Sequence, residues 1–490
     1  HSLDAWNPGK MTYPQLALHV AGQWLTQASG GERAVINPAD ESVLGMLPLA
    51  GQAELAAAAE SAARGFKQWR RLSALERFTI LRRASDLMRS RAKQIAAVLT
   101  LEQGKPQAEA LREVTLSADI IDFQAEEAKR LYGRTVPPRV PGILSQTVIR
   151  QPVGPVAAFT PWNFPVNLPS RKLGSALAAG CSVVIKPAEE TPGSCMEIVR
   201  CFLEAGVPPD ALNMVCGDPA EVSSTLIAHE AIRKVSFTGS VAVGKLLGEQ
   251  CARGVKRYTP ELGGHAPVIV CEDADLAFAI KSSIPAKFRN GGQVCASPIR
   301  FYVHRSHFDA FAAGLVKGAL ALKLGAGMDA DTQMGPLAHA GRLEDMQRFV
   351  DEAVGMGARL LCGGRRAARA GYFFEPTVLT DVPNGCRLSR EEPFGPIATL
   401  AAFDTLDEAI GLANASRYGL GAYAFTRDLV TTHRLGEEIE AGMVGINHFG
   451  VSQPELPFGG WKESGHGQEM GAEGLLAYTD LKTIVVGVPS

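Results

Sequence analysis

The stretch that decides the fold is 153–206, VGPVAAFTPWNFPVNLPSRKLGSALAAGCSVVIKPAEETPGSCMEIVRCFLEAG. Short apolar runs alternate in it with segments rich in helix formers, and the boundaries of the predicted strands and helices are 153–160, 168–180, 181–187 and 191–206. The last segment carries helix signals at both ends, with Thr191 as N-cap, Pro192 at the first position and Gly206 just past its end. Strand, helix and strand at this spacing predict βαβ units on a parallel sheet.

The same alternation extends in both directions along the chain. Two further strands (211–217 and 232–239) and the helix 219–229 between them complete a Rossmann-like domain of the kind that binds a dinucleotide or a phosphate. Further strand-like runs predict a second α/β domain from His265 to about Gly450; they are APVIVCED, IRFYVH, IATLAAF and GAYAFT. The fold class is therefore α/β with two large domains, as the length of 490 residues also indicates.

The flanking segments have different patterns. Residues 51–103 are helical in pattern, and Ser73 with Glu76 forms a capping box. Residues 133–151 are Pro-rich and then alternating, which predicts a loop that leads into an exposed strand, and the C-terminal AYTDLKTIVVGV is strand-like. Residues 1–10 have no regular period and are left out of the fold prediction.

Composition and charge argue against several classes of partner. The 49 basic and 51 acidic residues give a net charge of -2, which favours neither a nucleic-acid nor a membrane-surface partner. No apolar run reaches the length of a membrane span, and no basic-then-apolar leader is found. The nine cysteines are scattered, with no CxxC pair and no metal-ligand spacing, so we expect reduced thiols, a cytoplasmic location and no metal site.

A glycine-containing motif, SFTGSVAVGKLLG, lies where a predicted strand meets a helix. Gly239 and Gly244 would let the backbone approach a phosphate at the helix N-terminus. The motif is not a P-loop, because Leu246 stands where Ser or Thr would bind magnesium. On this motif alone, a tight turn that needs glycine is as good an interpretation as a ligand site.

Three other motifs place polar residues at strand ends or in rigid turns. Lys186 and Glu189, in VVIKPAEETP, are suited to the hydroxyls of a ribose; Glu261, in TPELGGHAP, is suited to act as a base with a raised pKa. Asn163, held between aromatic residues and prolines in TPWNFP, is suited to donate a hydrogen bond to an oxyanion. Each has a plainer interpretation as a solvated charge or a turn residue, and His265 near Glu261 is interpreted as structural.

Cys295 lies in KFRNGGQVCASPIRFYV, where neighbouring small residues leave space around the sulfur. A packed, inert thiol is the default interpretation of any single cysteine. No Cys–His pairing typical of papain-like hydrolases is found, so a reactive Cys295 would need another source of activation.

Taken together, these segments resemble the aldehyde dehydrogenase superfamily from about Gln15 to Val486. The resemblance is carried by seven elements in the family's order and spacing: PWNFP, KPAE, FTGS, ELGG, FRNGGQVC, EEPFGP and LPFGGWKESGHG. It implies the aldehyde dehydrogenase fold, with a modified Rossmann NAD(P)-binding domain that lacks GxGxxG, an α/β catalytic domain and a small β oligomerisation element. The implied domains are 11–131 with 152–260 for NAD(P), 261–450 for catalysis, and 132–151 with 476–490 for oligomerisation into a homodimer or homotetramer.

The resemblance also implies catalytic roles. Cys295 would be the nucleophile that forms a thiohemiacetal and then a thioester, and Asn163 with the backbone N–H of Cys295 would hold the oxyanion. Glu261 would activate the water that releases the acid, and Lys172 would support the proton relay. Because Glu261 is present, we expect hydrolysis of the thioester rather than acyl transfer to coenzyme A.

The implied cofactor is NAD, with NADP as the alternative, because Glu189 would repel a 2′-phosphate. The residues that the resemblance assigns to its binding are Trp162, Lys186, Glu189, Gly239, Ser240, Glu392 and Phe394.

The implied substrate carries a carboxylate. Arg171 and Arg289 match tunnel positions of the family, and two arginines there would bind a distal carboxylate through charge-assisted hydrogen bonds. This pattern resembles the succinate-semialdehyde and 2-oxoglutarate-semialdehyde dehydrogenases, with Ser452 and Phe458 as further substrate residues. Ser297 stands where some members carry a second cysteine, so no redox disulfide with the nucleophile is expected.

The sequence leaves open an alternative substrate class and two alternative classes of protein. An outward-facing Arg171 paired with a carboxylate would favour a dehydrogenase of neutral or aromatic aldehydes. A cysteine hydrolase or acyltransferase without a redox cofactor would bind no NAD(P). A non-catalytic member of the fold would show no turnover.

Overall fold

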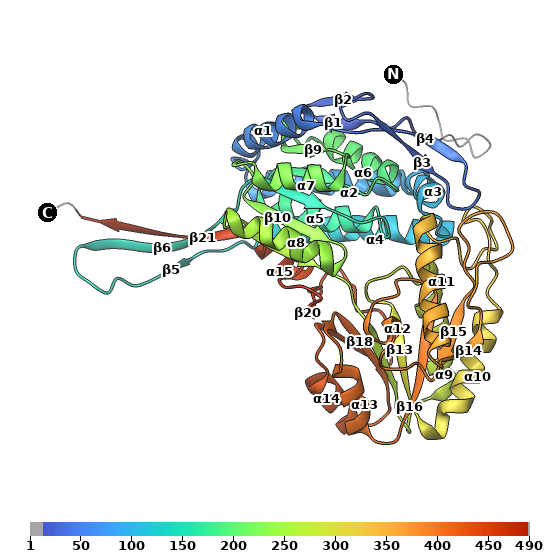
Figure 1. Cartoon of the computed structure of the whole chain (residues 1–490). Helices are drawn as coiled ribbons and strands as arrows, with labels where there is room; N and C mark the ends of the chain where they lie inside the picture. The colour runs from blue at the N-terminus through green and yellow to red at the C-terminus, as the bar shows by residue number, and fades with distance from the viewer. Residues whose placement is uncertain (1–12, 489–490) are drawn as a thin grey trace.

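The computed structural model describes residues 13–488; residues 1–12 and 489–490 lie outside the described part of the chain. It has two seven-stranded sheets, one above the other in Figure 1, and a long β arm that projects to one side. The α/β class predicted from the sequence is confirmed, and so are the individual βαβ strands.

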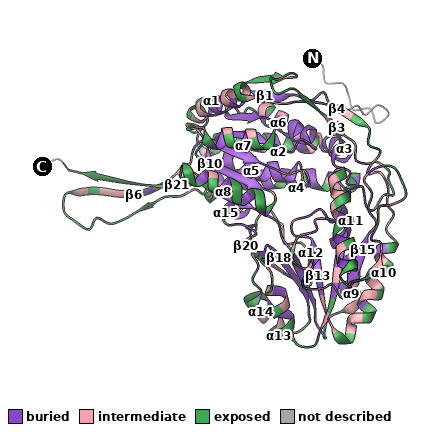
Figure 2. Cartoon of the chain, viewed as in Figure 1, coloured by how far each residue is buried: buried purple, intermediate pink, exposed green. Residues whose placement is uncertain are grey.

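The first sheet has five parallel strands and two antiparallel strands at one edge. In spatial order its strands are β11 (Arg257–Glu261), β10 (Lys234–Thr238), β7 (Val156–Phe159), β8 (Val183–Lys186), β9 (Leu212–Met214), β1 (Leu18–Val20) and β2 (Gln23–Leu25). The helices that connect the parallel strands are α5 (Asn167–Ala179), α6 (Pro192–Ala205), α7 (Pro219–Ala228) and α8 (Val241–Arg253). Every residue of β7 and β8 is buried, which explains the nearly continuous apolar sequence of the two strands. Helix α5 is also buried along its whole length, although it carries Arg171 and Lys172 (Figure 2).

The N-terminal part of the chain adds four helices, of which the first packs against the sheet and the other three pack against α5 or α6. They are α1 (Gln52–Trp69), α2 (Ala74–Ser90), α3 (Ala92–Gln103) and α4 (Gln107–Ala128), and they follow the hairpin of β3 (Glu32–Ile36) and β4 (Val43–Pro48). The predicted capping box of α2 is present, with Ser73 and Glu76 bonded reciprocally. Thr191 is the N-cap residue of α6, as predicted, but its hydroxyl makes no capping bond; Gly206 adopts the predicted left-handed C-cap. Helix α4 lies beyond the helical stretch that the sequence predicted.

The second sheet begins a few residues after the first sheet ends. In spatial order its strands are β14 (Arg359–Cys362), β15 (Thr377–Thr380), β16 (Ile397–Phe403), β13 (Pro298–His304), β12 (Ala266–Val270), β18 (Gly421–Phe425) and β19 (Met443–Ile446). Only the pairing of β14 with β15 is antiparallel. The helices of this part are α9 (Leu276–Phe288), α10 (Phe308–Leu320), α11 (Ala340–Gly355), α12 (Arg387–Arg390), α13 (Leu406–Asn414) and α14 (Leu429–Glu438).

The arm is formed by segments far apart in the sequence. Strand β6 (Ile143–Pro152) pairs antiparallel with β21 (Thr479–Gly487), and β5 (Arg134–Thr135) pairs with the other edge of β6. The predicted exposed strand and the strand-like C-terminal segment are therefore both present, and they are partners. Most of β21 is exposed to solvent (Figure 2).

Between the second sheet and the arm, the chain returns to the first sheet. This segment contains β20 (Trp461–Lys462), which pairs with β17 (Tyr418–Gly419), and α15 (Gly471–Leu476), which packs against α4 and α5. Leu262 N donates to Ser464 O at 3.0 Å, so the segment lies beside the end of β11. This return brings residues from near the C-terminus to the carboxyl ends of the parallel strands.

Candidate active site

The carboxyl ends of four adjacent parallel strands bring seven of the sequence-predicted residues to one edge of the first sheet. Ligand sites in parallel sheets form at this edge. Glu261 ends β11, and the other predicted residues follow β10, β7 and β8 in turn; they are Gly239 with Ser240, Trp162 with Asn163, and Lys186 with Glu189. Residues separated by a hundred positions in the sequence therefore meet at one place.

Cys295 lies in a tight loop between α9 and β13. The residue is half-buried, whereas seven of the other eight cysteines are buried packing residues. Burial by the surrounding protein raises the pKa of its thiol to about 12; Arg171 opposes this shift, and the carboxyls of Glu392 and Glu261 add to it. The resting thiol is therefore neutral and needs a base or a nearby positive charge to become a nucleophile.

Two glycines bring the ELGG turn against the Cys295 loop. A Cβ on Gly264 would lie 2.6 Å from the backbone oxygen of Cys295, and a Cβ on Gly263 would overlap the Glu392 carboxylate. The Gly264 N–H donates to Glu392 Oε1 at 3.0 Å. The clash at Gly264 is with backbone, so glycine is needed there for this close approach, and the charges of Glu261 and Glu392 both act on the Cys295 thiol.

Glu261 is a buried carboxyl group without a hydrogen-bond partner. It is 2% exposed, and neither of its oxygens is bonded among the described residues. Burial, together with the negative charge of Glu469, raises its pKa well above the ordinary value, while Lys172 and Arg171 lower it. A neutral carboxyl with a raised pKa and unused oxygens is suited to general acid–base chemistry.

Lys172 lies behind Glu261 in a buried polar cluster. Its ammonium group donates to Glu469 Oε1 at 2.6 Å and to Ser236 Oγ at 2.9 Å. Lys172 and Glu469 are both almost completely buried, so water screens the electrostatic effect of their charges on neighbouring groups only weakly. Glu469, five residues after Ser464, was missed by the sequence analysis.

Arg171 points into the protein. It is 7% exposed; its Nε donates to Asn167 Oδ1 at 2.8 Å and its Nη2 donates to Ser452 Oγ at 3.0 Å. The guanidinium carbon lies 4.4 Å from the centre of the Phe458 ring. Nη1 has no hydrogen-bond partner, and the nearest carboxylate oxygen, on Glu469, is 3.9 Å away. Three of the four predicted substrate residues therefore form one cluster with an unused cationic N–H.

Arg289, the fourth predicted substrate residue, has a different environment. It is exposed, and its guanidinium group lies 5.8 Å from the ring centre of Phe164. No described contact joins it to Arg171. The structure therefore brings Arg171, Ser452 and Phe458 together and leaves Arg289 outside that cluster.

Asn163 is buried beside the Cys295 loop. Its Nδ2 donates to Gln293 O at 3.1 Å, two residues before Cys295, and its Oδ1 has no partner. Each side-chain amide has two N–H groups, so one of them is left for another acceptor. This arrangement is compatible with the predicted oxyanion role.

The predicted dinucleotide residues form two groups. Lys186 and Glu189 are both buried and paired at 2.6 Å, and Glu189 Oε1 also accepts from Gly217 N at 3.3 Å. Ser240 caps α8 through Val243 N, whereas a Cβ on Gly244 would lie 2.5 Å from Leu262, so Gly244 serves helix packing.

Aromatic residues form the other group. Trp162 packs edge-on against Phe394 and His339, with ring centres 5.5 and 5.4 Å apart. Burial raises the pKa of the neighbouring Glu392 to about 8, so this carboxyl is mostly protonated at neutral pH.

Buried hydroxyls at the same edge of the sheet fit a polar ligand. Thr160 and Thr238, just after β7 and at the end of β10, have buried hydroxyls without a hydrogen-bond partner. Such groups are costly unless a ligand or water satisfies them. Together with the Lys186–Glu189 pair and the N-terminus of α8, they fit the ribose and phosphates of a dinucleotide.

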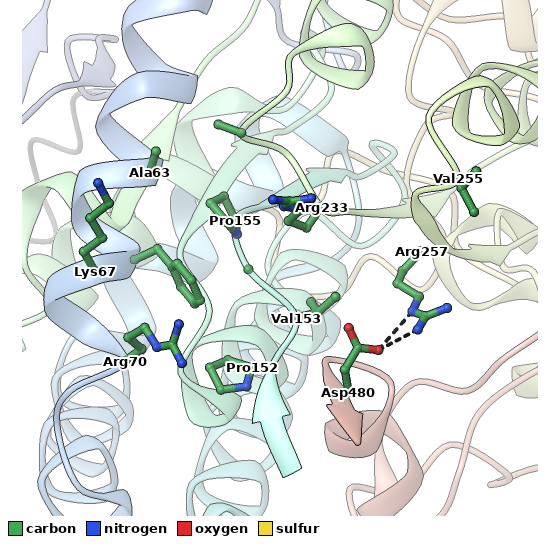
Figure 3. Close-up of a pocket in the computed structure, with 13 residues that line it drawn as sticks. Ala63, Lys67, Arg70, Pro152, Val153, Pro155, Arg233, Val255, Arg257 and Asp480 are labelled. Atoms are coloured by element: carbon green, nitrogen blue, oxygen red, sulfur yellow. Dashed lines mark hydrogen bonds and ion pairs between the residues drawn. The ribbon is translucent and has the colours of Figure 1, made fainter. Parts of the chain in front are cut away.

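A separate pocket of about 650 Å³ lies at the base of the arm (Figure 3). Its charged lining includes Lys67, Arg70, Arg233 and Arg257, the last paired with Asp480 at 2.8 Å. None of the predicted site residues lines it. Within residues 13–488 no helix is long and apolar enough to cross a membrane, and no His, Cys, Asp and Glu cluster could hold a metal ion.

Known proteins resemble this chain over nearly its whole length. The model of the "Aldehyde dehydrogenase family" matches residues 24–484. A 4-(hydroxymethyl)benzenesulfonate dehydrogenase of Comamonas testosteroni is 47% identical over 95% of this chain and 97% of its own length. Succinate-semialdehyde dehydrogenase [NADP(+)] of Escherichia coli is 42% identical over 96% and 97%. The crystal structure of a Bacillus cereus aldehyde dehydrogenase in complex with NAD+ is 35% identical, with a TM-score of 0.95 over 99% of both chains.

Proposed function

The chain belongs to the aldehyde dehydrogenase family, and from that premise we propose that it oxidises an aldehyde with a distal anionic group to the acid, with NAD(P) as hydride acceptor. The observation that carries the substrate class is the Arg171 cluster. A buried guanidinium group with an unused N–H is costly unless an anion binds it. Ser452 Oγ accepts from Nη2 of the same guanidinium group, and the Phe458 ring lies 4.4 Å from its central carbon, which suits a substrate anion attached to an apolar body.

We propose that the anion is a carboxylate, as in succinate semialdehyde or 2-oxoglutarate semialdehyde. A planar carboxylate matches the fork of a guanidinium group. The name of the Escherichia coli relative supports this choice. A sulfonated aromatic aldehyde is the second candidate, because the Comamonas testosteroni relative is named for a benzenesulfonate and Phe458 would pack against a ring.

Cys295 is proposed as the nucleophile. Its proton leaves to a base, its sulfur bonds to the aldehyde carbon, and the carbonyl oxygen becomes an oxyanion. The free N–H of Asn163 and the backbone N–H of Cys295 would donate to that oxygen. NAD(P), when bound, supplies the acceptor for the hydride that leaves this carbon, and the product on Cys295 is a thioester.

Glu261 is proposed to release the acid. Its carboxylate form takes a proton from water, and the resulting hydroxide attacks the thioester and frees Cys295. Lys172 and Glu469 would set the pKa of Glu261, because one lowers it and the other raises it. The unbonded Glu261 oxygens support this role, since they remain free for a water molecule.

The dinucleotide site is proposed at the carboxyl ends of β7, β8 and β10. Lys186 and Glu189 would hold the adenosine ribose, and Gly239 and Ser240 would lie near the pyrophosphate. Trp162, Glu392 and Phe394 would border the nicotinamide end. Glu189 favours NAD, because a second negative charge would meet a buried carboxylate.

We also propose an oligomeric state and a cellular location. The open edge of β21 in the arm would join copies of the chain into a homodimer or homotetramer. The free state of all nine cysteines supports work in a reducing compartment, with the cytoplasm as our proposal.

The experiment is a comparison of aldehydes by NADH absorbance. Succinate semialdehyde, 2-oxoglutarate semialdehyde and 4-formylbenzenesulfonate are compared with butanal and benzaldehyde, with NAD and with NADP. We expect an anionic aldehyde to exceed the neutral one of similar size in kcat/KM by about 100-fold or more. Equal turnover of neutral aldehydes would contradict the substrate class and leave the aldehyde dehydrogenase assignment intact.

A further inference from the structure

We propose that Asn290 and Gln103 are positioning residues for aldehyde oxidation, because they determine which end of the Asn163 amide faces the reacting oxygen. The inference rests on the oxyanion role proposed above for Asn163. Neither residue is expected to touch the substrate.

A side-chain amide has a donor end and an acceptor end of nearly the same shape. If the Asn163 amide turned over, its carbonyl oxygen would face the developing negative charge and oppose the reaction. The observed orientation is fixed at one point, where Asn163 Nδ2 donates to Gln293 O at 3.1 Å. With the amide turned over, two carbonyl oxygens would meet there instead.

A chain of amides holds that point in place. The backbone N–H of Lys105 donates to Gln103 Oε1 at 3.0 Å, so the amide nitrogen of Gln103 must point the other way. That nitrogen donates to Asn290 Oδ1 at 2.8 Å. Asn290 Nδ2 then donates to Asn163 O at 2.9 Å and to Gln293 O at 3.3 Å. Gln103 thus orients the Asn290 amide, and Asn290 in turn holds the main-chain oxygen of Gln293, which is the acceptor of Asn163 Nδ2.

Asn290 has an unusual backbone conformation. Its φ and ψ are 52° and 28°, in the left-handed region that asparagine tolerates better than most residues. Its N–H donates to Glu109 Oε2 at 2.9 Å, and its carbonyl accepts from Gln293 Nε2 at 2.9 Å. The residue is 3% exposed, so these bonds are shielded from water.

The backbone of Asn163 has a second, separate support. Lys105 Nζ donates to Asn163 O at 2.9 Å and pairs with Glu113 at 2.5 Å. Glu113 Oε1 accepts from the backbone N–H groups of Val166 and Asn167, both at 3.0 Å. This ion pair holds the main chain, whereas Asn290 alone reaches both Asn163 O and Gln293 O. Loss of the Asn290 amide should therefore loosen the Asn163 side chain while its main chain stays in place.

The test uses the full-length enzyme and the variant Asn290→Gly, which keeps the left-handed backbone and removes the amide. Asn447→Gly is the matched control, because Asn447 also has a left-handed φ of 54° but lies exposed at the end of β19. We expect Asn290→Gly to lower kcat by about 10- to 100-fold, below the 100- to 1,000-fold typical of losing an oxyanion donor itself. The KM values for aldehyde and NAD(P), and the rate of Cys295 alkylation by iodoacetamide, should change by less than about threefold, and Asn447→Gly should match the wild type.

The decisive comparison is a double-mutant cycle. If Asn290 acts through Asn163, then Asn290→Gly should cost little further kcat in an Asn163→Ala background. Multiplicative losses in the double variant, or a parallel loss of Cys295 alkylation, would overturn the proposal and indicate a merely structural role. Asn290→Asp keeps the size and backbone preference but cannot donate, so it provides the same comparison if the glycine variant is unstable. Wild-type enzyme that oxidises no aldehyde would instead overturn the proposed function.

Discussion

Arg171 Nη2 donates a hydrogen bond to Ser452 Oγ at 3.0 Å, and this contact joins helix α5 to the loop before Phe458. The neighbouring residue of the same helix, Lys172, pairs with Glu469 at 2.6 Å. Two consecutive residues of α5 thus support two different parts of the proposed site. Arg171 belongs to the cluster proposed to bind the substrate anion, and the charge of Lys172 lowers the pKa of Glu261, the proposed general base.

Replacement of the nucleophile should end the reaction. Cys295→Ala is expected to lower NADH formation by at least about 1,000-fold, because it removes the sulfur on which the thioester is proposed to form. Cys362→Ala is the control, since Cys362 is also partly exposed but lies at the far edge of the second sheet. Steady-state rates of both variants give the answer; retained activity in Cys295→Ala would disprove the covalent route.

Glu261→Gln should separate acylation from hydrolysis. Without a base for water, the thioester should accumulate, so a burst of up to one NADH per active site should precede a steady state slowed by about 100- to 1,000-fold. Rapid-mixing absorbance measures the burst, and mass spectrometry measures the acyl adduct. The proposed role fails if the steady-state rate is unchanged.

The two partners of Glu261 should shift the pH profile in opposite directions. Burial and Glu469 raise the pKa of the Glu261 carboxyl, so its basic form appears only as the pH rises through that raised value. Glu469→Gln removes a negative charge and should move the acid limb of the deacylation profile to lower pH. Lys172→Met removes a positive charge and should move it to higher pH. Shifts in the same direction would contradict this assignment.

Cofactor preference should depend on Glu189. Its carboxylate is buried against Lys186. Glu189→Gln should raise kcat/KM with NADP relative to NAD by about tenfold or more, because a buried charge that repels the 2′-phosphate is removed. Glu190→Gln is the control, since Glu190 pairs with Arg33 at the surface. An unchanged ratio would place the source of cofactor preference elsewhere.

Breaking the buried Lys105–Glu113 ion pair should lower the stability of the protein. Lys105→Met leaves the Glu113 carboxylate buried without its counter-ion and should lower the free energy of unfolding by about 3–5 kcal/mol. Adding Glu113→Gln should restore part of this loss. Urea unfolding of the three proteins measures both effects, and equal stability of Lys105→Met and wild type would show that the pair is weakly coupled.

The sequence was sufficient for the elements that have strong local patterns. The strands β7, β8, β9 and β10 are buried on both faces, so each appears as a short apolar run between helix signals. Helix α4 was not predicted, although ten of its residues are buried. Its start at Pro106 has no side-chain cap, so no capping residue marks it in the sequence.

The candidate site was predictable where motifs are local and unpredictable where distant segments meet. Cys295, Glu261 and Asn163 stand in short recognisable motifs, and the structure brings their segments together. Glu469 was missed because a lone glutamate in a loop has no signal of its own; only the return of the chain to β11 places it beside Lys172. Gln103 and Asn290 were missed for the same reason, since 187 positions separate them.

We propose above all that Arg171 selects the anionic aldehyde. The most direct test is to measure kcat/KM of Arg171→Met with succinate semialdehyde, 4-formylbenzenesulfonate and butanal. Arg289→Met is the matched control, because Arg289 is exposed and lies outside the Arg171 cluster. We predict that Arg171→Met lowers kcat/KM for the preferred anionic aldehyde by about 100-fold or more and changes that for butanal by less than about threefold. Equal losses for charged and neutral aldehydes, or no loss for either, would contradict the claim.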